Sequence, residues 1–419
     1  MSFFKMLFDS AIDETSNERL FFLSGDGGTG KTFLLNFLLF KLRSAGKKVF
    51  ATASTGVAAN KFFSVFVDEV TMLNKMLLEN VDLLCKSLNP ENKNRPFGGK
   101  VVVISGDWKQ SLPVVEYSSP EKQVEACFQS SDLYKQFRKV CLQQNMRLNP
   151  LEVSHKNWLY KIGTVISGEK VAIPKEMFVN SREELINFVY DKGFDSVGED
   201  MLKRLMLAPT NKTVDLNNSE ILKKLANSTV EYFSVDKCVN EDEFSVTAAD
   251  SDISQINYLT PSGMPAHKLS LKEGMVIVLL VNLNTSKGLC NGTRLIVKKL
   301  GANLIEAETI SKTGIGVIVG ISRINNVYKE KRPDGVSFER FQFPVRSAFT
   351  MTITKAQGQT CERLGIDFSD EPFAHGQLYT ALSRATSGKN IKIFAPNSEK
   401  DKHGNILIQN VVAANLTFD

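Results

Sequence analysis

Residues 20–32 read LFFLSGDGGTGKT, an apolar run followed by a glycine-rich turn that ends in lysine and threonine. The turn fits the pattern G-x-x-x-x-G-K-[ST], in which backbone N–H groups converge on phosphate oxygens while the lysine and threonine reach the phosphates and a magnesium ion. The apolar run before the turn and the apolar stretch Phe33 to Leu42 after it predict the strand and helix that the motif requires. Nucleotide phosphates are therefore expected to bind to Gly25, Asp26, Gly27, Gly28, Thr29, Gly30, Lys31 and Thr32.

The composition is that of an ordinary globular protein. The chain has 419 residues, of which 42% are apolar and 23% charged, enough apolar material for two or three domains. Its net charge of +5 is compatible with nucleic acid if the cations gather along one groove. Six cysteines are scattered singly and no apolar run approaches the roughly 18 residues of a membrane span, so we expect neither a disulfide framework nor membrane insertion.

Four apolar segments in the first 115 residues predict a parallel α/β unit. After the strand at 20–24, further strands are expected at 48–53, 62–67 and 100–105, each running into polar residues. From about 116 to 200 the pattern is helical, and a second α/β pattern starts at Arg204. Short β-branched segments between about 275 and 343 predict a small barrel inserted into the second unit, and the tail from Pro396 has no clear pattern. The expected division is 1–148, a linker at 149–200, 201–395 and a tail at 396–419.

Polar residues that follow the expected strands are the candidates for chemistry, because ligands bind at the carboxyl ends of parallel strands. Asp68 can hold Mg²⁺ together with Thr32, and Glu69 can deprotonate an attacking water. Gln110 follows the next strand, where an amide could sense a γ-phosphate. Arg147 and Arg384 are candidate cations for transferring phosphoryl charge, although a lone arginine more often forms a surface ion pair.

The order of the motifs resembles the petite integration frequency (PIF) type of superfamily 1B DNA helicase, in the form found in Helitron transposons and their eukaryotic relatives. The resemblance runs from about Leu20 to Ala395. The segments that carry it are 25–32, 53–59, 67–69, 97–115, 145–147, 207–211, 288–294, 342–346, 355–360 and 375–384.

The resemblance implies a P-loop NTPase with two RecA-like domains and an SH3-like β-barrel insert in the second. It implies an ATP- and Mg²⁺-dependent motor that moves 5′ to 3′ on single-stranded DNA and opens duplex junctions. Asp68, Glu69, Gln110, Arg147 and Arg384 would then serve hydrolysis. The residues expected near DNA are Thr55, Gly56, Thr352, Thr354 and Lys355.

Two departures from the family pattern concern the N-terminal segment and the first crossover. Phe3 to Asn17 contains no glutamine to read adenine, which puts the selectivity for ATP in question. Only eleven residues, 57–67, separate Gly56 from Asp68, whereas a crossover between parallel strands needs about a dozen residues or more. Relatives are expected to carry several tens more residues here, including the wedge that splits the duplex.

Three functions remain open on the sequence. The first is a helicase acting as a monomer in DNA repair, recombination or telomere maintenance, in the nucleus or alternatively the mitochondrion. The second is a truncated or degenerate copy that binds ATP and DNA without unwinding, which the short crossover favours. The third is an RNA-directed or unrelated phosphate-loop ATPase, which fits the first motif but not the later ones.

Overall fold

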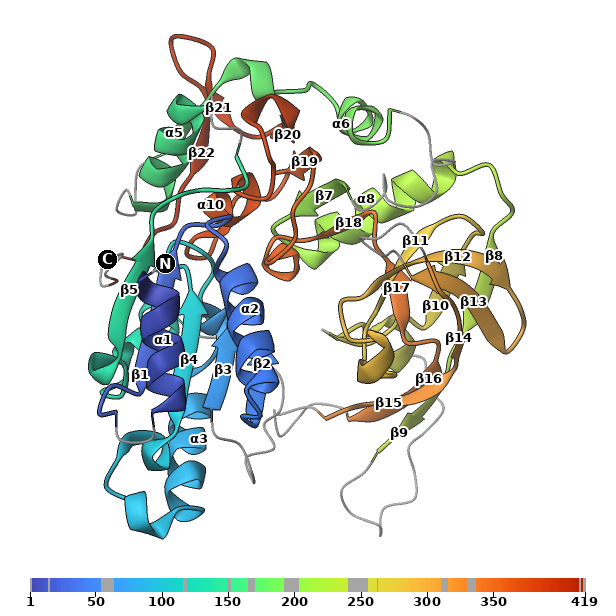
Figure 1. Ribbon diagram of the computed structural model, residues 1–419. Coiled ribbons are helices and arrows are strands. Elements are labelled where there is room, and N and C mark those ends of the chain that lie inside the picture. Colours follow the sequence, from blue (N-terminus) through green and yellow to red (C-terminus); the bar gives the residue numbers. More distant parts are fainter. Residues whose placement is uncertain are drawn as a thin grey trace.

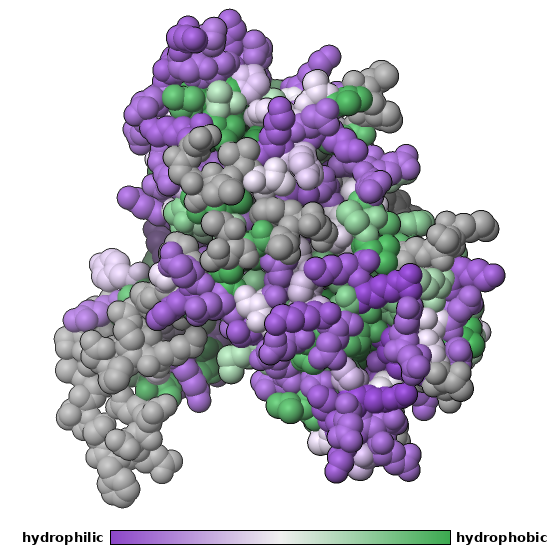
Figure 2. Space-filling model, turned by 90° about the vertical axis from the view of Figure 1, so that its left-hand side faces the viewer, coloured by the Kyte–Doolittle hydropathy of each residue, from purple (hydrophilic) through white to green (hydrophobic). Residues whose placement is uncertain are grey.

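A computed structural model describes residues 2–13, 16–53, 64–115, 119–148, 152–164, 170–191, 203–239, 255–261, 263–309, 316–329, 337–413 and 416. The molecule contains two parallel sheets and a β-rich region. In Figure 1 the first sheet lies on the left and the β-rich region on the right. No helix in these ranges is long and apolar enough to cross a membrane. The face seen in Figure 2 is largely hydrophilic, with apolar side chains scattered between polar ones.

The first sheet has the strand order β2-β3-β4-β1-β5, and all its pairings are parallel. Phe21 and Leu23 point to a core shared with the first two helices, while Phe22 points to the opposite core beneath α3. This alternation buries both faces, as a parallel sheet requires. The elements are α1 (Ser2–Ile12), β1 (Leu20–Gly25), α2 (Lys31–Ser44), β2 (Val49–Ala53), β3 (Ser64–Asp68), α3 (Lys75–Ser87), β4 (Val101–Gly106), α4 (Pro120–Ala126) and β5 (Arg138–Leu142).

The expected strands of this unit are present, but the expectation of a helical pattern from 116 onward missed β5. Its exposed positions, among them Arg138 and Lys139, weaken the apolar signal. Pairing with β1 through Phe21↔Arg138 makes β5 the edge of the sheet, so its outer side needs no apolar cover. The sequence pattern therefore did not predict this edge strand.

The second parallel sheet has the order β18-β7-β19-β20. Its helices come from segments before and after β7 in the sequence. Its core includes Leu207, Ile366 and Ile393. The elements are α5 (Val153–Thr164), α6 (Arg182–Val189), β7 (Arg204–Ala208), α8 (Asn211–Lys224), β18 (Thr350–Thr352), the short 3-10 helix η8 (Thr354–Ala356), β19 (Arg363–Asp367), α10 (Gln377–Leu382) and β20 (Ile391–Phe394).

The β-rich region is larger than the sequence indicated, because it begins at Val230 rather than near 275. A five-stranded antiparallel sheet has the order β14-β13-β12-β11-β17, and smaller sheets pair β15-β16-β9 and β10-β8. Closure into an SH3-like barrel stays a prediction. The strands are β8 (Val230–Phe233), β9 (Val235–Cys238), β10 (Lys268–Leu271), β11 (Val276–Leu279), β12 (Arg294–Leu300), β13 (Leu304–Thr309), β14 (Ile318–Ser322), β15 (Ile324–Tyr328), β16 (Phe338–Gln342) and β17 (Val345–Ser347).

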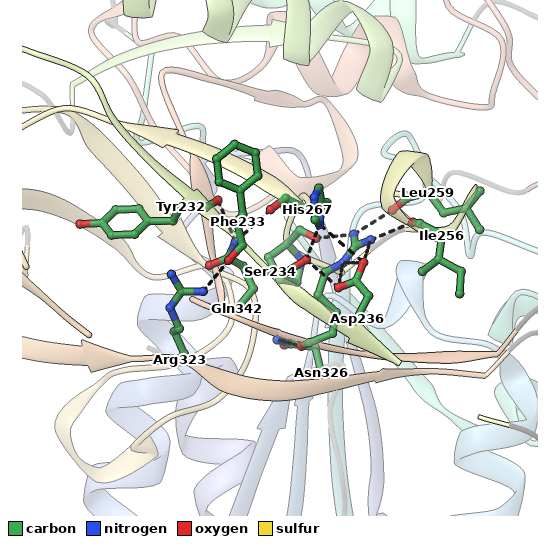
Figure 3. A network of polar contacts seen from close by, with 12 residues as sticks. Tyr232, Phe233, Ser234, Asp236, Ile256, Leu259, His267, Arg323, Asn326 and Gln342 are labelled. Atoms are coloured by element: carbon green, nitrogen blue, oxygen red, sulfur yellow. Dashed lines mark hydrogen bonds and ion pairs between the residues drawn. The ribbon is translucent and has the colours of Figure 1, made fainter. Parts of the chain in front are cut away.

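A buried polar network explains how the segment before β10 joins this region (Figure 3). Arg340 on β16 is fully buried and donates to both carboxylate oxygens of Asp236 at 2.7–3.1 Å. The same guanidinium donates to the backbone oxygens of Ile256, Leu259 and Pro265. Because each N–H group of a buried guanidinium needs an acceptor, these bonds hold Ile256, Leu259 and Pro265 against the sheet.

The chain after Pro396 is structured, so the expectation of a tail without pattern is wrong. β21 (Glu399–Lys400) and β22 (Ile406–Gln409) form a hairpin, and β22 pairs with β6 (Lys170–Ile173). Ile406 and Ile408 are buried in the core of the second parallel sheet. The partner strand lies more than 200 residues earlier in the chain, where the sequence pattern had indicated a helical linker.

Candidate active site

The glycine-rich turn lies between β1 and α2, where it can cradle phosphate. Gly28 and Gly30 adopt positive φ angles of 91° and 88°, and Gly30 caps the 14-residue helix α2. Lys31 is buried, and its Nζ donates to the backbone oxygens of Gly25 at 2.6 Å and Asp26 at 3.1 Å. A helix N-terminus with a lysine held inside the loop is a favourable place for anionic oxygens.

Thr32 and Asp68, the predicted magnesium residues, meet at the end of the first sheet. Thr32 Oγ1 donates to Asp68 Oδ2 at 2.6 Å, and Ser105 on β4 donates to the other carboxylate oxygen. These hydroxyl and carboxylate oxygens are hard donors that suit Mg²⁺, which keeps several waters and takes further oxygens from phosphates. No group of three or more His, Cys, Asp or Glu side chains that could hold a metal ion occurs among the described residues.

Glu69 follows Asp68 in a strained, left-handed conformation with φ at 55°. Burial raises the pKa of Glu69, the charge of Asp68 raises it further, and Lys31 and Arg384 oppose these effects. Within the described part of the chain, Oε2 of Glu69 has no hydrogen-bond partner. A buried carboxylate with a raised pKa and a free oxygen has the properties of a general base.

Gln110 lies in the loop after β4 and connects the two parallel sheets. Its Nε2 donates to Asp107 Oδ2 at 3.0 Å, and Gln357 Nε2 donates to its Oε1 at 3.3 Å. Gln357 follows η8 in the second unit. A ligand that moves Gln110 would therefore change its hydrogen bond to Gln357 in the second unit.

Arg147 and Arg384 both lie at the glycine-rich turn, although they come from different parts of the chain. A Cβ atom placed on Gly27 would lie 3.2 Å from Nη2 of Arg384 and 3.4 Å from Nη1 of Arg147. Arg384 is fully buried and Arg147 donates to the backbone oxygen of Ser383 at 2.8 Å. Burial and the neighbouring Arg384 lower the pKa of Arg147 to about 10. Two guanidinium groups close together repel each other, so an anion that binds between them is stabilised by both.

Other residues at the turn were not singled out from the sequence. Asn145 Nδ2 donates to the backbone oxygen of Gly27 at 3.0 Å, and Met146 N donates to that of Gly28 at 2.8 Å. The hydroxyl of Tyr379 accepts from Gly27 N at 3.3 Å. Both side chains belong to segments that carry the family resemblance, and that membership was the available signal.

The residues expected near DNA are only partly gathered in space. Thr352 and Lys355 line a cavity of about 510 Å³ together with Arg346, beside α8 and the strand β11 of the β-rich region. Thr354 lies between them in η8. Burial and the charge of Arg346 lower the pKa of Lys355. Thr55 and Gly56 fall outside the described residues.

The chain matches the family model of PIF1-like helicases over residues 2–63 and 59–164. Residues 256–300 match the 2B domain of DNA helicase Pif1, and 339–416 match a herpes helicase family. The chain is a relative of the PIF1-like helicases. The two segments of the PIF1-like match overlap at residues 59–63, within the short connection between β2 and β3.

Comparisons with individual proteins agree with this relationship. The chain is 26% identical to the human ATP-dependent DNA helicase PIF1 over 89% of its own length and 58% of the relative's. It is 27% identical to Pif1 of Campylobacter jejuni, spanning 88% of that protein. Among solved structures, Pif1 from Candida albicans and a Bacteroides Pif1 with ADP-AlF3 and single-stranded DNA each share 22% identity, with TM-scores of 0.64 and 0.65. These structures cover 93% and 94% of the chain, and the matches cover 94% and 92% of those proteins. The chain therefore has the expected RecA-like P-loop fold.

Proposed function

We propose that the chain is an ATP-dependent DNA helicase that couples ATP hydrolysis to 5′-to-3′ translocation on single-stranded DNA and to duplex unwinding. The observation that carries this proposal is the approach of Arg384, from the second unit, to Gly27 in the phosphate loop of the first. A cation delivered across a domain boundary makes hydrolysis depend on closure of the two units.

In this proposal the residues 25–32 hold the phosphates of ATP, with Lys31 as the cation at the β- and γ-phosphates. Glu69 takes the proton of the attacking water, and Arg147 with Arg384 stabilises the charge on the transferred phosphoryl group. Thr32 and Asp68 hold Mg²⁺, which neutralises phosphate charge when bound. Gln110 passes the state of the γ-phosphate to the second unit through Gln357.

Single-stranded DNA is proposed to pass along the cavity beside Thr352 and Lys355, with Thr354, Thr55 and Gly56 contributing to the same path. The cations that line this cavity are Arg346 and Lys355. Arg346 also donates to Asn211 and pairs with Asp215 at 2.5 Å, which orients its guanidinium. Such a surface suits a phosphate backbone. We place the activity in DNA repair, recombination or telomere maintenance, in the nucleus or mitochondrion, with one chain as the active unit.

The test is ATP hydrolysis by the purified chain with and without single-stranded DNA. We expect stimulation by DNA, and a loss of about 100-fold or more in kcat for Lys31→Ala, since that lysine is the phosphate ligand. Lys135→Ala is the matched control, because Lys135 is exposed and forms an ion pair with Asp132, which is also exposed. Unstimulated hydrolysis that is indifferent to Lys31 would contradict the proposal, and stronger stimulation by RNA would favour an RNA-directed ATPase.

A second candidate is a protein that binds ATP and DNA without unwinding. The parallel strands β2 and β3 are joined by residues 54–63 alone, fewer than a helical crossover normally uses. Strand separation of a 5′-tailed duplex distinguishes the two functions: its occurrence excludes this candidate, and DNA-stimulated hydrolysis without it supports this candidate.

A further inference from the structure

Tyr379 contacts the phosphate loop from the second unit. It lies in α10, is 2% exposed, and its hydroxyl accepts a hydrogen bond from Gly27 N at 3.3 Å. The same hydroxyl donates to Asp107 Oδ2 at 3.0 Å. One hydroxyl group therefore joins the phosphate loop to the loop that follows β4.

Asp107 extends this connection to Gln110. The carboxylate oxygen that accepts from Tyr379 also accepts from Gln110 Nε2 at 3.0 Å, and the other carboxylate oxygen accepts from Lys109 N at 3.2 Å. Asp107 is 3% exposed, so its orientation is set by these donors rather than by water. The hydroxyl of Tyr379 thus helps fix the carboxylate that fixes the amide of Gln110.

The backbone before Tyr379 leaves it little freedom. Gly376 has φ at 69°, and a Cβ atom there would lie 2.4 Å from the backbone oxygen of Lys109. On the other side of Tyr379, Thr380 Oγ1 accepts from Ser111 N at 3.2 Å. The first turn of α10 is therefore pressed against residues 109–111, and Tyr379 can move only if that contact opens.

The protonation state of Tyr379 agrees with this arrangement. Burial raises the pKa of Tyr379 well above its usual range, and the charge of Asp107 raises it further. The phenol consequently remains a donor to the carboxylate throughout the physiological pH range.

We propose that Tyr379 is a positioning residue for ATP hydrolysis, which links Gly27 of the phosphate loop to Gln110 through Asp107 when the two units close. This inference rests on the proposed function. Tyr379 itself touches no reacting atom; it acts by orienting Asp107, and through it the amide that senses the γ-phosphate.

The experiment compares Tyr379→Phe with Tyr190→Phe in the full chain. Tyr190 is also buried, in the hydrophobic core that includes the β-rich region, and its hydroxyl donates to the backbone oxygen of Phe349 at 2.7 Å. Each variant loses one buried hydroxyl, so similar decreases in Tm are expected. We expect Tyr379→Phe to lower the DNA-stimulated kcat about tenfold or more with little change in KM, and Tyr190→Phe to leave both near wild type.

An unchanged kcat in Tyr379→Phe, or an equal loss in Tyr190→Phe, would overturn the proposal. A second measurement separates it from the proposed function. Hydrogen exchange of residues 107–111 is followed in the presence of ADP and aluminium fluoride, which requires no turnover. Protection in the wild type that is lost in Tyr379→Phe supports the linkage even if the wild type proves inactive, whereas equal protection in both contradicts it.

Discussion

Glu69 is held in a buried position that changes its acidity. Burial and Asp68 together raise its pKa above the ordinary value of 4.5, against the opposing charges of Lys31 and Arg384. A general base acts in its ionised form, so hydrolysis should decline as the pH falls through this raised pKa. The acidic limb of the profile of kcat against pH should therefore lie above the range of an exposed glutamate. A limb near pH 4.5 would show that Glu69 is not the titrating base.

Glu69→Gln keeps the shape of the side chain but cannot accept a proton. We expect kcat to fall about 100- to 10,000-fold while the affinity for a fluorescent ADP analogue stays near wild type, because the phosphate loop is untouched. Glu79→Gln is a suitable control, since Glu79 lies in α3 and accepts from Ser131 rather than facing the phosphate loop. A large loss of ADP affinity in Glu69→Gln would point to a structural role instead.

At this scale, residues within a contiguous motif were predictable and their partners were not. Thr32 follows from the phosphate-loop motif and Asp68 from its place at the end of β3, and the structure brings these two residues together. The contact between Gly27 and Tyr379 joins residues 352 positions apart, and local spacing contains no information on such a pair. Only the family resemblance connected the two segments.

At the scale of elements, the segment before α10 joins the C-terminal segment through His375. Its Nδ1 accepts from Ala413 N at 2.9 Å, so the proton must lie on Nε2, which donates to the backbone oxygen of Trp108 at 2.8 Å. Burial lowers the pKa of His375 below the ordinary 6.5, while Trp108 and the charge of Asp107 act in the opposite direction. The neutral ring is therefore the form that fits both partners.

A pH dependence of stability follows from this neutral ring. Below about pH 6.5 the unfolded chain takes up the proton first, so the free energy of unfolding should fall as the pH drops toward the lower folded pKa. His155 contributes in the same direction, because burial lowers its pKa as well. We expect His375→Gln to weaken the dependence between pH 5 and 6.5. An equal pH dependence of the free energy of unfolding in the wild type and in His375→Gln, measured by chemical denaturation, would refute the neutral-ring assignment.

Elements with a strong local pattern were predicted, and those stabilised by distant partners were missed. β1, β4 and α2 carry continuous apolar runs that the sequence shows directly. β22 has only four residues and becomes a strand by pairing with β6, which itself lies in a segment expected to be helical. Its stability comes from tertiary contacts, which a reading of local periodicity does not include.

At the scale of the whole molecule, the C-terminal segment contacts both parallel-sheet units. Ile406 and Ile408 are buried in the core of the second unit, while Leu416 is buried in the core of the first. Between them, Val411 accepts a hydrogen bond from Gly376 N at 3.0 Å. The segment thus runs alongside the residues before α10, which pack against the loop that contains Gln110.

Truncation after Ala395 should therefore destabilise both parallel-sheet units, because it removes residues that are buried in both cores. Each of Ile406, Ile408 and Leu416 contributes about 1.5–3 kcal/mol by burial, so their loss costs on the order of 5 kcal/mol, comparable with the entire stability of many domains. We expect the truncated chain to be largely insoluble. Ile408→Ala should lower the free energy of unfolding by about 2–5 kcal/mol. Leu407→Ala on the same strand should cost less, because Leu407 is only partly buried. A soluble truncated chain with the wild-type Tm would show that the segment is dispensable, and the cores would then have to be closed by the remaining residues alone.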